Sequence, residues 1–471
     1  MDDLINQCHG AFSNHESWKR TRELLYGSLN CTGRHTVTGI LSAGGHQFKD
    51  WSSAYRVFSK QRINIQKIMS VIQANVIQET VECGNIVAHM DDTIIKKTGK
   101  KIPGTAWRRD PLGPPFHTNF VWGQRFIQVS MALPIDGEIG QSRAIPVDFH
   151  HCPTVLRPKK NAAQQEIMQY KEEKKIAKLS KQGGERIKLL RQNLDLHGAI
   201  GKQLILSVDG SYTNSEVLKN LPQRVTLIGR IRKDTRLYTI PDNQPIKGRR
   251  RVYGEQLPTP EQIRQSDKYP WQEVKAWAAG KTHDFKVKMI NNIRWKSAGQ
   301  NHDLKLVVIR ALGYRLSKGS KILYRQPAYL ICSDTELDMQ TLLQSYLWRW
   351  EIEVNFREEK SMLGCGQAQV RNIKSAENFP AFIAATYALI HIASHRAYQK
   401  SGSPTIPRPK WYTNENKDRI TTGDLLNNIR AHLHAKAIGI NFDDFVNKYI
   451  VLPSLRNEKN LSVIAPCYVR N

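Results

Sequence analysis

The chain has 471 residues, which is too long for one ordinary globular domain, so we expect a catalytic core with appended regions. Forty per cent of the residues are hydrophobic and 24% are charged, a composition with ample material for a buried core. Lys and Arg outnumber Asp and Glu by 70 to 42, which gives a net charge of +28. Because each neutralised phosphate releases a condensed counterion, this charge favours nucleic acid as a partner.

The cysteine pattern argues against a zinc module and against a disulfide framework. Seven cysteines form no CxxC pair, and this usage is typical of a reducing cytosol. The first residues have no basic start followed by an apolar core, so we expect no signal peptide. The longest uncharged apolar stretch, about Phe379 to Ile392, is shorter than the roughly 20 residues of a membrane span and predicts a buried helix.

Residues 1 to about 80 are predicted to be helical, because apolar residues recur there at mixed three- and four-residue spacing. Gly39, Gly44 and Gly45 are expected to divide this region into short helices. Residues 161 to 197 predict a charged helix broken at Gly183-Gly184, whose charges we interpret as a solvated face. Three short apolar runs predict strands at Ile86 to Met90, Phe126 to Leu133 and Leu204 to Val208.

The second half of the chain returns from a polar region to strands and helices. The polar region, roughly 233 to 303, contains Arg249-Arg250-Arg251. A long helix is predicted from about Asp338, and the prolines near residue 404 predict a linker before a final helical region. Further strands are predicted at Thr226 to Arg232, Leu304 to Ala311 and Tyr329 to Cys332. Strands followed by helices, with a basic insertion, indicate an α/β core that carries an inserted subdomain.

Several standard catalytic motifs are absent from the sequence. The segment from Gly99 to Thr105 has the glycine spacing of a phosphate-binding loop but lacks its lysine. The chain contains no GxSxG elbow and no HExxH pair. Nucleotide hydrolysis and serine or zinc hydrolysis are therefore disfavoured.

Acidic residues stand at the ends of two predicted strands. Asp91 and Asp92 follow the run Ile86 to Met90, and Asp209 follows Leu204 to Val208. Such residues are common in turns and helix caps, but a buried acid is costly unless it is paired, capped or bound to a cation. In a strongly basic chain, two such positions favour a site for Mg²⁺ or Mn²⁺, the ions of phosphodiester chemistry.

The segment from Tyr346 to Lys360 places one acid between two cations on a helix face. If it is helical, at about 100° per residue, then Arg349, Glu353 and Lys360 all fall within about 60° of Tyr346. Arg349 and Glu353 alone would be an ordinary helix-surface pair. The addition of Tyr346 and Lys360 favours a metal-binding carboxylate flanked by phosphate-binding groups.

Tyr346, Arg349, Glu353 and Lys360 have the spacing of a known signature, Tyr-x2-Arg-x3-Glu-x6-Lys. The chain thereby resembles the Asp-Asp-Glu (DDE) insertion-sequence transposases of the branch that carries this Tyr-Arg-Glu-Lys signature. The likeness covers roughly residues 15 to 375. It also includes Asp91-Asp-Thr93, the strand that ends at Asp209, Gly33-Arg-His-Thr-Val-Thr-Gly39 and Gln369-Val-Arg371.

The resemblance implies an α/β fold with a ribonuclease-H-like catalytic core interrupted by a β-rich insertion. It implies that Asp91, Asp209 and Glu353 are catalytic and bind two Mg²⁺ ions, for which Mn²⁺ would substitute. Arg349 and Lys360 would hold DNA phosphates near the cut, with support from Tyr346. The expected partner is double-stranded DNA, both at the terminal inverted repeats of the element and at the target, bound by a homodimer in the bacterial cytoplasm at the nucleoid. The 3′-hydroxyl freed at the element's end would then join to target DNA.

These observations together predict five regions. They are a helical DNA-binding region (1–80), the first part of the core (81–232), a β-rich insertion (233–303), the second part of the core with the catalytic glutamate helix (304–400), and a C-terminal helical region (401–471).

Three alternatives stay open at the level of sequence. Family members carry Thr or Ser two residues after the first catalytic aspartate, which selects Asp91 through Thr93, whereas others carry an acid just before it, which would select Asp92. The chain would also be compatible with a metal-dependent nuclease of the same fold, or with a domesticated DNA-binding protein that has lost its chemistry.

Trp271, Trp277 and Trp295 could stack on a flipped base, as insertion tryptophans do in some relatives, but such residues are more often core aromatics.

Overall fold

The computed structural model describes residues 1–110, 113, 117, 119–242, 250–299, 302–314, 319–399, 406 and 419–437. The chain divides into two compact units. The helical unit comprises residues 1–72, 95–123 and 356–471, and the sheet unit comprises residues 73–94 and 124–355. Arg249, the prolines near residue 404 and most of the predicted region 401–471 lie outside the described residues.

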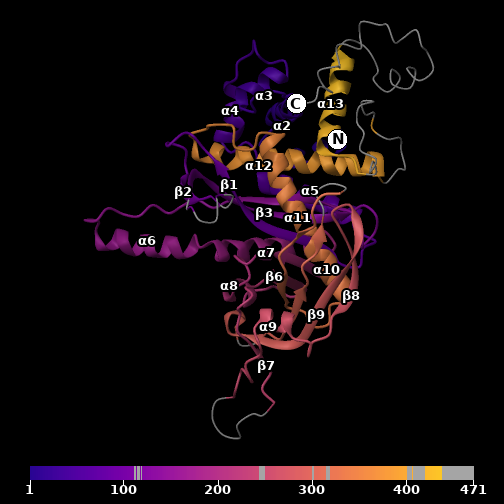
Figure 1. The fold of residues 1–471 in the computed structure, drawn as a ribbon. Coiled ribbons are helices and arrows are strands. Elements are labelled where there is room, and N and C mark those ends of the chain that lie inside the picture. Colours follow the sequence, from indigo (N-terminus) through magenta and orange to yellow (C-terminus); the bar gives the residue numbers. More distant parts are fainter. Residues whose placement is uncertain are drawn as a thin grey trace, which may run out of the picture. The chain divides into compact units, whose positions relative to one another are not determined.

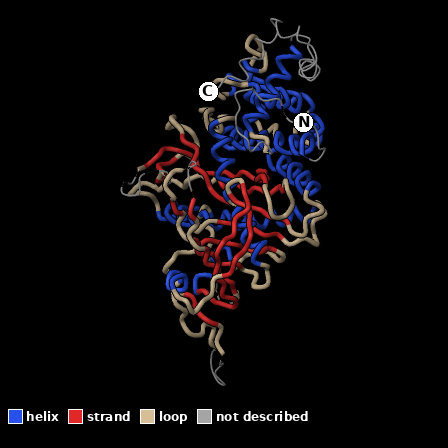
Figure 2. The backbone as a smooth tube through the Cα atoms, turned by 45° about the vertical axis from the view of Figure 1, so that its right-hand side comes forward, coloured by secondary structure: helices blue, strands red, loops and turns tan. Residues whose placement is uncertain are grey.

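Most strands of a large mixed sheet belong to the sheet unit (Figure 1). Its strands are ordered β2-β3-β1-β5-β6-β13-β10-β9-β7, with β4 paired to β3 and β8 paired to β9, and Figure 2 shows them in red. The strands are β1 (Ile86–Lys96), β2 (Ala106–Arg109), β3 (Phe120–Pro134), β4 (Ser142–His151), β5 (Leu204–Val208), β6 (Val225–Arg230), β7 (Leu237–Thr239), β8 (Gln272–Ala278), β9 (Lys281–Trp295), β10 (Leu304–Ile309) and β13 (Ala328–Cys332). A separate pair consists of β11 (Gly313–Tyr314) and β12 (Leu323–Tyr324).

The helices are α1 (Asp2–Gln7), α2 (His15–Asn30), α3 (Val37–Ala43), α4 (Ser52–Ser59), α5 (Ile65–Glu79), α6 (Gln164–Ile176), α7 (Leu179–Leu196), α8 (Ser215–Leu218), α9 (Pro260–Gln265), α10 (Met339–Trp348), α11 (Trp350–Ser361), α12 (Ile373–Ser394) and α13 (Thr422–Ala437). The described residues also include the short 3₁₀ helices η1 (His9–Ala11) and η2 (Lys296–Ala298) and the π-helical segment η3 (His395–Gln399). In the helical unit, α12 contacts α4 and α13, and α2 contacts α3, α4 and α13.

Three parallel strands, β1, β5 and β6, lie side by side in the middle of the sheet. Every residue of β5 is buried, as expected for a strand covered on both faces. β13, β10 and β9 then continue the sheet in antiparallel pairing. β7 and β8, which lie in the predicted insertion, both pair with β9. This mixed sheet with flanking helices is a ribonuclease-H-like α/β core with a β-rich insertion, as the resemblance predicted.

Different helices cover the two faces of these central strands. On one face, the hydroxyl of Ser207 in β5 donates to the carbonyl of Ser345 in α10 at 3.1 Å. On the other face, Gly183 of α7 approaches Met90 of β1. One apolar cluster on the α10 face includes Val87, Ile205, Ile228, Leu342, Leu343 and Trp348. Alternate residues of β1 therefore point to different helices.

Each predicted strand has an observed counterpart, but two of them are several residues longer than predicted, and several other strands were not predicted. β1 extends beyond Met90 to Lys96, and β3 begins at Phe120 instead of Phe126. Polar residues break the apolar run in the second half of β1, where burial is only partial, so hydrophobicity alone did not mark it. β4 was not predicted. It contains Pro146, which lies at a register shift opposite Val129 and Ser130, where a strand tolerates proline.

The predicted break at Gly183-Gly184 was wrong. α6 ends at Ile176 and α7 begins at Leu179, so both glycines lie inside α7. A Cβ atom at Gly183 would lie 2.7 Å from two ring carbons of Tyr212, whereas one at Gly184 would have no neighbour within 4 Å. The first glycine therefore permits close packing and does not end the helix.

This pair of glycines predicts opposite effects of the same substitution. Gly183→Ala should lower the free energy of unfolding by about 1–3 kcal/mol, because the buried ring of Tyr212 must shift. Gly184→Ala should instead raise it by up to about 1 kcal/mol, the helix-propensity gain of alanine over glycine. Chemical denaturation of both variants checks this. Equal shifts in one direction would contradict the packing argument.

The apolar stretch Phe379 to Ile392 lies inside α12 and is buried, as predicted. Phe379 and Phe382 pack edge-on against Phe58 of α4, with ring centroids 5.3 and 5.5 Å away. Among the described residues, no helix has the length and hydropathy needed to cross a membrane.

Candidate active site

Asp91 and Asp209 lie side by side at one edge of the sheet. β1 and β5 are parallel, and Met90 is in register with Val208. An aspartate follows each of these residues, so Asp209 stands at the carboxyl end of β5 and Asp91 lies beside it, where the pairing of the two strands ends and β1 continues. This edge is where open α/β sheets bind ligands.

Strand alternation separates Asp91 from Asp92. Asp91 points toward the α10 side, where its Oδ2 lies 3.2 Å from Nη1 of Arg349. Asp92 points to the α7 side, where its Oδ2 lies 3.2 Å from Nε of Arg125 and its Oδ1 accepts the Tyr212 hydroxyl at 3.2 Å. Asp91 thus faces the predicted catalytic helix, and Asp92 is held in a structural network.

Asp209 is oriented by the turn that follows β5. The backbone N–H of Ser211 donates to its Oδ1 at 2.9 Å, and the Ser211 hydroxyl donates to its Oδ2 at 3.2 Å. The hydroxyl of Thr213 donates to the Asp209 backbone carbonyl at 2.7 Å. These bonds fix an aspartate side chain in a defined position, as in other Asx turns.

Arg349 joins Asp91 to Glu353. Its Nη1 contacts Asp91, and its Nη2 lies 3.3 Å from Oε1 of Glu353. The expectation of one continuous helix from Tyr346 to Lys360 was wrong, because α10 ends at Trp348 and α11 begins at Trp350. Arg349 is the cap between the two helices, with φ of −54° and ψ of −29°, so the helical direction is nearly kept.

Burial and a like charge raise the pKa of Asp91 to about 7. Burial in the protein is the larger cause, and the neighbouring carboxylate of Asp209 adds to it, while Arg349 opposes both. Two residues earlier on the same face of β1, burial lowers the pKa of His89 to about 3, and the positive charge of Arg349 lowers it further. His89 is therefore a neutral imidazole, and neither of its ring nitrogens has a hydrogen-bond partner among the described residues.

Tyr346 and Lys360 occupy different surroundings. Tyr346 is half-buried on α10 and, together with Arg349, lines a cavity of the sheet unit. Lys360 lies on α11 seven residues after Glu353, in the part of that helix that belongs to the helical unit. There, burial lowers the pKa of Lys360, and its Nζ lies 5.8 Å from the centre of the Phe356 ring.

The cavity has a volume of about 750 Å³ and is lined by basic, aromatic and aliphatic side chains. No acidic residue lines it among the residues that the structure describes. Its basic lining residues are Arg230, Lys281, His283, Arg310, Arg325 and Arg349, and its aromatic ones are Phe285, Tyr324, Tyr346 and Trp350. Such a lining suits an anionic ligand with aromatic rings.

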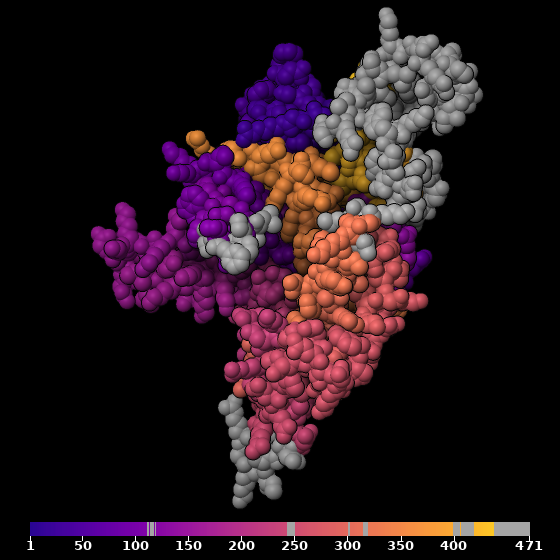
Figure 3. All heavy atoms as spheres, in the orientation of Figure 1, coloured from indigo at the N-terminus to yellow at the C-terminus, as the bar shows by residue number. Residues whose placement is uncertain are grey.

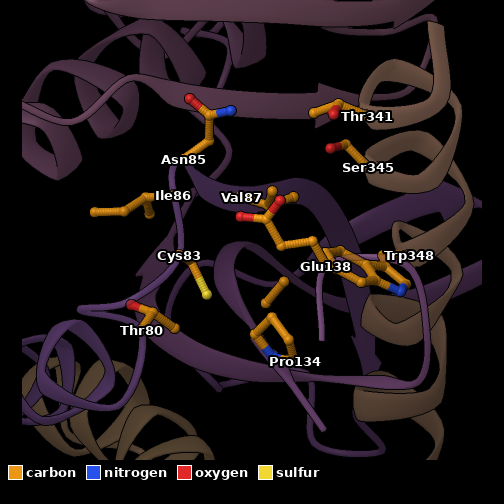
Figure 4. Close-up of a pocket in the computed structure, with 11 residues that line it drawn as sticks. Thr80, Cys83, Asn85, Ile86, Val87, Pro134, Glu138, Thr341, Ser345 and Trp348 are labelled. Atoms are coloured by element: carbon orange, nitrogen blue, oxygen red, sulfur yellow. The ribbon is translucent and has the colours of Figure 1, made fainter. Parts of the chain in front are cut away.

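A second cavity lies at the opposite end of β1 and has a volume of about 30 Å³. Figure 4 shows Glu138 between Trp348 and Val87, the second residue of the strand. Glu138 Oε1 accepts the backbone N–H of Gly84 at 2.9 Å. This space holds at most a water molecule or two and takes no part in the site at Asp91.

Asp91 and Asp209 fit a divalent cation by their chemistry. Both offer carboxylate oxygens, the ligands that Mg²⁺ and Mn²⁺ prefer, and a cation between them would relieve the repulsion that raises the pKa of Asp91. Within the described part of the chain, no group of three or more His, Cys, Asp or Glu side chains converges as a metal site. Glu353 is linked to the aspartates through Arg349, whose guanidinium stands in for a cation.

The sequence did not identify four residues that surround these carboxylates. Arg125 and Tyr212 hold Asp92, His89 lies under Asp91, and Ser211 orients Asp209. Only Ser211 had a local signal, because an aspartate followed two residues later by serine often forms an Asx turn. Arg125 and Tyr212 reach Asp92 from distant parts of the chain, and His89 shares a face of β1 with Asp91 because the strand continues through both residues.

A protein-family model described as "DDE superfamily endonuclease" matches residues 8–300. The match includes Asp91 and Asp209 and ends before Glu353. No curated protein matches the chain.

Proposed function

This chain belongs to the DDE superfamily endonucleases, and on that premise we propose that it is a DNA transposase of the branch with the Tyr-Arg-Glu-Lys signature. Members of this superfamily are metal-dependent nuclease-type enzymes that act on DNA. The observation that carries the proposal is the arrangement at the sheet edge. Asp91 and Asp209 leave neighbouring parallel strands, and Arg349 connects Asp91 to Glu353.

We assign the catalytic and metal-binding roles to Asp91, Asp209 and Glu353. Mg²⁺ held by these carboxylates, or Mn²⁺ in its place, would activate the attacking oxygen and stabilise the leaving oxygen. Ser211 holds Asp209 in position, and strand alternation points Asp91 to the same site. Burial keeps His89 neutral beneath them, so that it adds no competing positive charge.

Arg349, Tyr346 and Lys360 are assigned to DNA. A guanidinium binds phosphate through two parallel hydrogen bonds, and Arg349 already contacts two carboxylates through its two terminal nitrogens. Tyr346 lines the same basic cavity, and Lys360 follows two helical turns after Glu353 on α11. The net charge of +28 supports DNA as the partner of the whole chain.

The five predicted regions keep their roles as part of this proposal. The helices of residues 1–80 would bind the ends of the element, and residues 401–471 would form a C-terminal helical region. Residues 81–232 and 304–400 would supply the catalytic core around the insertion of residues 233–303. A homodimer assembled on DNA would hold the two ends of an insertion sequence together in the bacterial nucleoid.

Strand joining separates a transposase from a nuclease of the same fold. The full chain is incubated in Mg²⁺ with a labelled duplex that carries the ends flanking its gene, together with an unlabelled target duplex. We expect a nick at the element's end and then a longer labelled product in which the 3′-hydroxyl is joined to the target. Glu353→Gln should bind the same duplex with unchanged affinity and form neither product.

Two other outcomes would contradict the proposal. Metal-dependent nicking without any joined product would indicate a nuclease. Tight binding with no cleavage by either protein, in Mg²⁺ or in Mn²⁺, would indicate a DNA-binding protein without chemistry.

A further inference from the structure

One helix of the sheet unit, α6, has no buried residue. It has 13 residues, and Figures 1 and 3 show it projecting from the body of the sheet unit. An isolated helix of this length is marginal in water, and most helices in proteins gain their stability from packing. A helix held out in this way is a candidate surface for a partner.

The lysines of α6 lie on one face of the helix, and its glutamates lie outside that face. Counted from Ile167 at about 100° per residue, Lys171, Lys174 and Lys175 fall within one arc of about 100°. All three lysines are exposed, and the Nζ of Lys174 lies 5.7 Å from the centre of the Tyr170 ring on the same helix. The acidic residues of α6 all fall outside that arc, and they are Glu166, Glu172 and Glu173.

We call the segment from Pro153 to Lys178, which contains α6, the arm. The residues at its two ends are fixed next to the candidate active site. At its start, the backbone N–H of Cys152 donates to the carbonyl of Arg125 at 2.8 Å, and the Arg125 side chain pairs with Asp92. At its end, Gln182 donates to the carbonyl of Ile176 at 2.9 Å, and its Oε1 lies 2.8 Å from Nε2 of His150. The arm is therefore anchored through Arg125 to Asp92, the residue that follows Asp91 on β1.

We propose that the lysine face of α6 binds the phosphate backbone of duplex DNA that is engaged at Asp91. This inference rests on the proposed function, because it assigns part of the DNA path to a surface outside the catalytic residues. The excess of positive charge in this segment favours DNA over a second copy of the chain as the partner. Seven basic and three acidic residues lie between Pro153 and Lys178, and a second copy of a chain with net charge +28 would be repelled by the same lysines.

Salt-dependent DNA binding by the full chain tests the arm. The triple variant Lys171→Gln, Lys174→Gln, Lys175→Gln is compared with wild type on a labelled duplex without divalent ions, so that no cleavage occurs. We expect about tenfold weaker binding near physiological salt, and a slope of log affinity against log salt that falls by about 0.9 for each phosphate that the variant no longer neutralises. Circular dichroism and thermal melting should be unchanged, since α6 has no buried residue.

The acidic face supplies the matched control. Glu166→Gln, Glu172→Gln, Glu173→Gln changes the same helix by the same number of charges, and we expect an unchanged slope with equal or tighter binding. The inference is overturned if the lysine variant keeps the wild-type slope and affinity, or if the two variants shift affinity by equal and opposite amounts with no change in slope. It is also overturned if the lysine variant alters self-association in sedimentation without altering DNA binding.

Failure of the arm and failure of the proposed function are distinguishable. Wild-type cleavage and joining, with an unchanged slope in the lysine variant, would reject the arm alone. A reduced slope in the lysine variant, with no cleavage by wild type, would support DNA binding by the arm and contradict the proposed transposase function.

Discussion

Asp91→Asn should reduce metal-dependent DNA cleavage by on the order of 10⁴-fold, whereas Asp92→Asn should reduce it by no more than about 100-fold. The reason is strand alternation in β1. Asp91 points to Arg349 and lies beside Asp209, while Asp92 points to Arg125 and Tyr212. Removal of a metal-binding carboxylate abolishes the chemistry, and removal of a supporting group only perturbs it. Single-turnover cleavage rates in Mg²⁺ measure the difference.

The free energy of unfolding should be lowered by Asp92→Asn, the variant with the smaller effect on cleavage, and not by Asp91→Asn. Asp92→Asn leaves Arg125 without its charged partner and should lower the free energy of unfolding by about 1–3 kcal/mol. Asp91→Asn should not destabilise the metal-free protein, because it removes a buried carboxylate that repels Asp209. If Asp92→Asn reduced cleavage by about 10⁴-fold and Asp91→Asn did not, the first ligand would be Asp92.

The second large effect concerns the pH dependence of stability in the metal-free protein. The pKa of Asp91 is about 7 in the folded protein and ordinarily 3.8, so between these values the folded state binds the extra proton. The free energy of unfolding should therefore fall as the pH rises from about 4 to about 7. The difference in pKa corresponds to at most about 4 kcal/mol, at about 1.36 kcal/mol per pH unit.

Asp91→Asn removes this titration, so its stability advantage over wild type should grow with pH and level off above about pH 7. Adding Mg²⁺ at pH 8 should stabilise wild type through binding to the ionised pair and should leave the variant nearly unchanged. Urea denaturation at a series of pH values, with and without Mg²⁺, follows both effects.

Asp148 provides the control for this experiment. Burial also raises its pKa, to about 6, but it lies beside Arg186 and not at the candidate site. Asp148→Asn should make the fall below about pH 6 less steep, and it should keep both the contribution of Asp91 and the stabilisation by Mg²⁺. A wild-type slope that survives unchanged in Asp91→Asn would show that the carboxylate is ionised in the folded protein.

The sequence predicted the parts of the site that have a local signal. Leu204 to Val208 was predicted with its observed bounds, because every residue of that strand is buried and all but Ser207 are apolar. The α/β class followed from the order of such runs. The spacing from Tyr346 to Lys360 predicted a helix, and the structure has two helices there, which meet at Arg349.

The parts that the sequence did not predict depend on distant contacts. Whether Asp91 or Asp92 faces Arg349 follows only when β1 is known to continue through both residues as a strand. Arg125 and Tyr212 reach Asp92 from β3 and from the turn after β5, and neither position has a local pattern. Gly183 looked like a helix break because its packing partner, Tyr212, is 29 residues away.

The most direct test of the central claim is whether Asp209 binds the catalytic metal. Cleavage of the end-carrying duplex is measured for Asp209→Cys in Mg²⁺ and in Mn²⁺, with Ser211→Ala as a control that disturbs the same turn without removing the carboxylate. Because Mn²⁺ accepts a sulfur ligand more readily than Mg²⁺ does, the cysteine variant should be inactive in Mg²⁺ and partly restored in Mn²⁺. Activity of Asp209→Cys in Mg²⁺ equal to that of wild type would contradict the account.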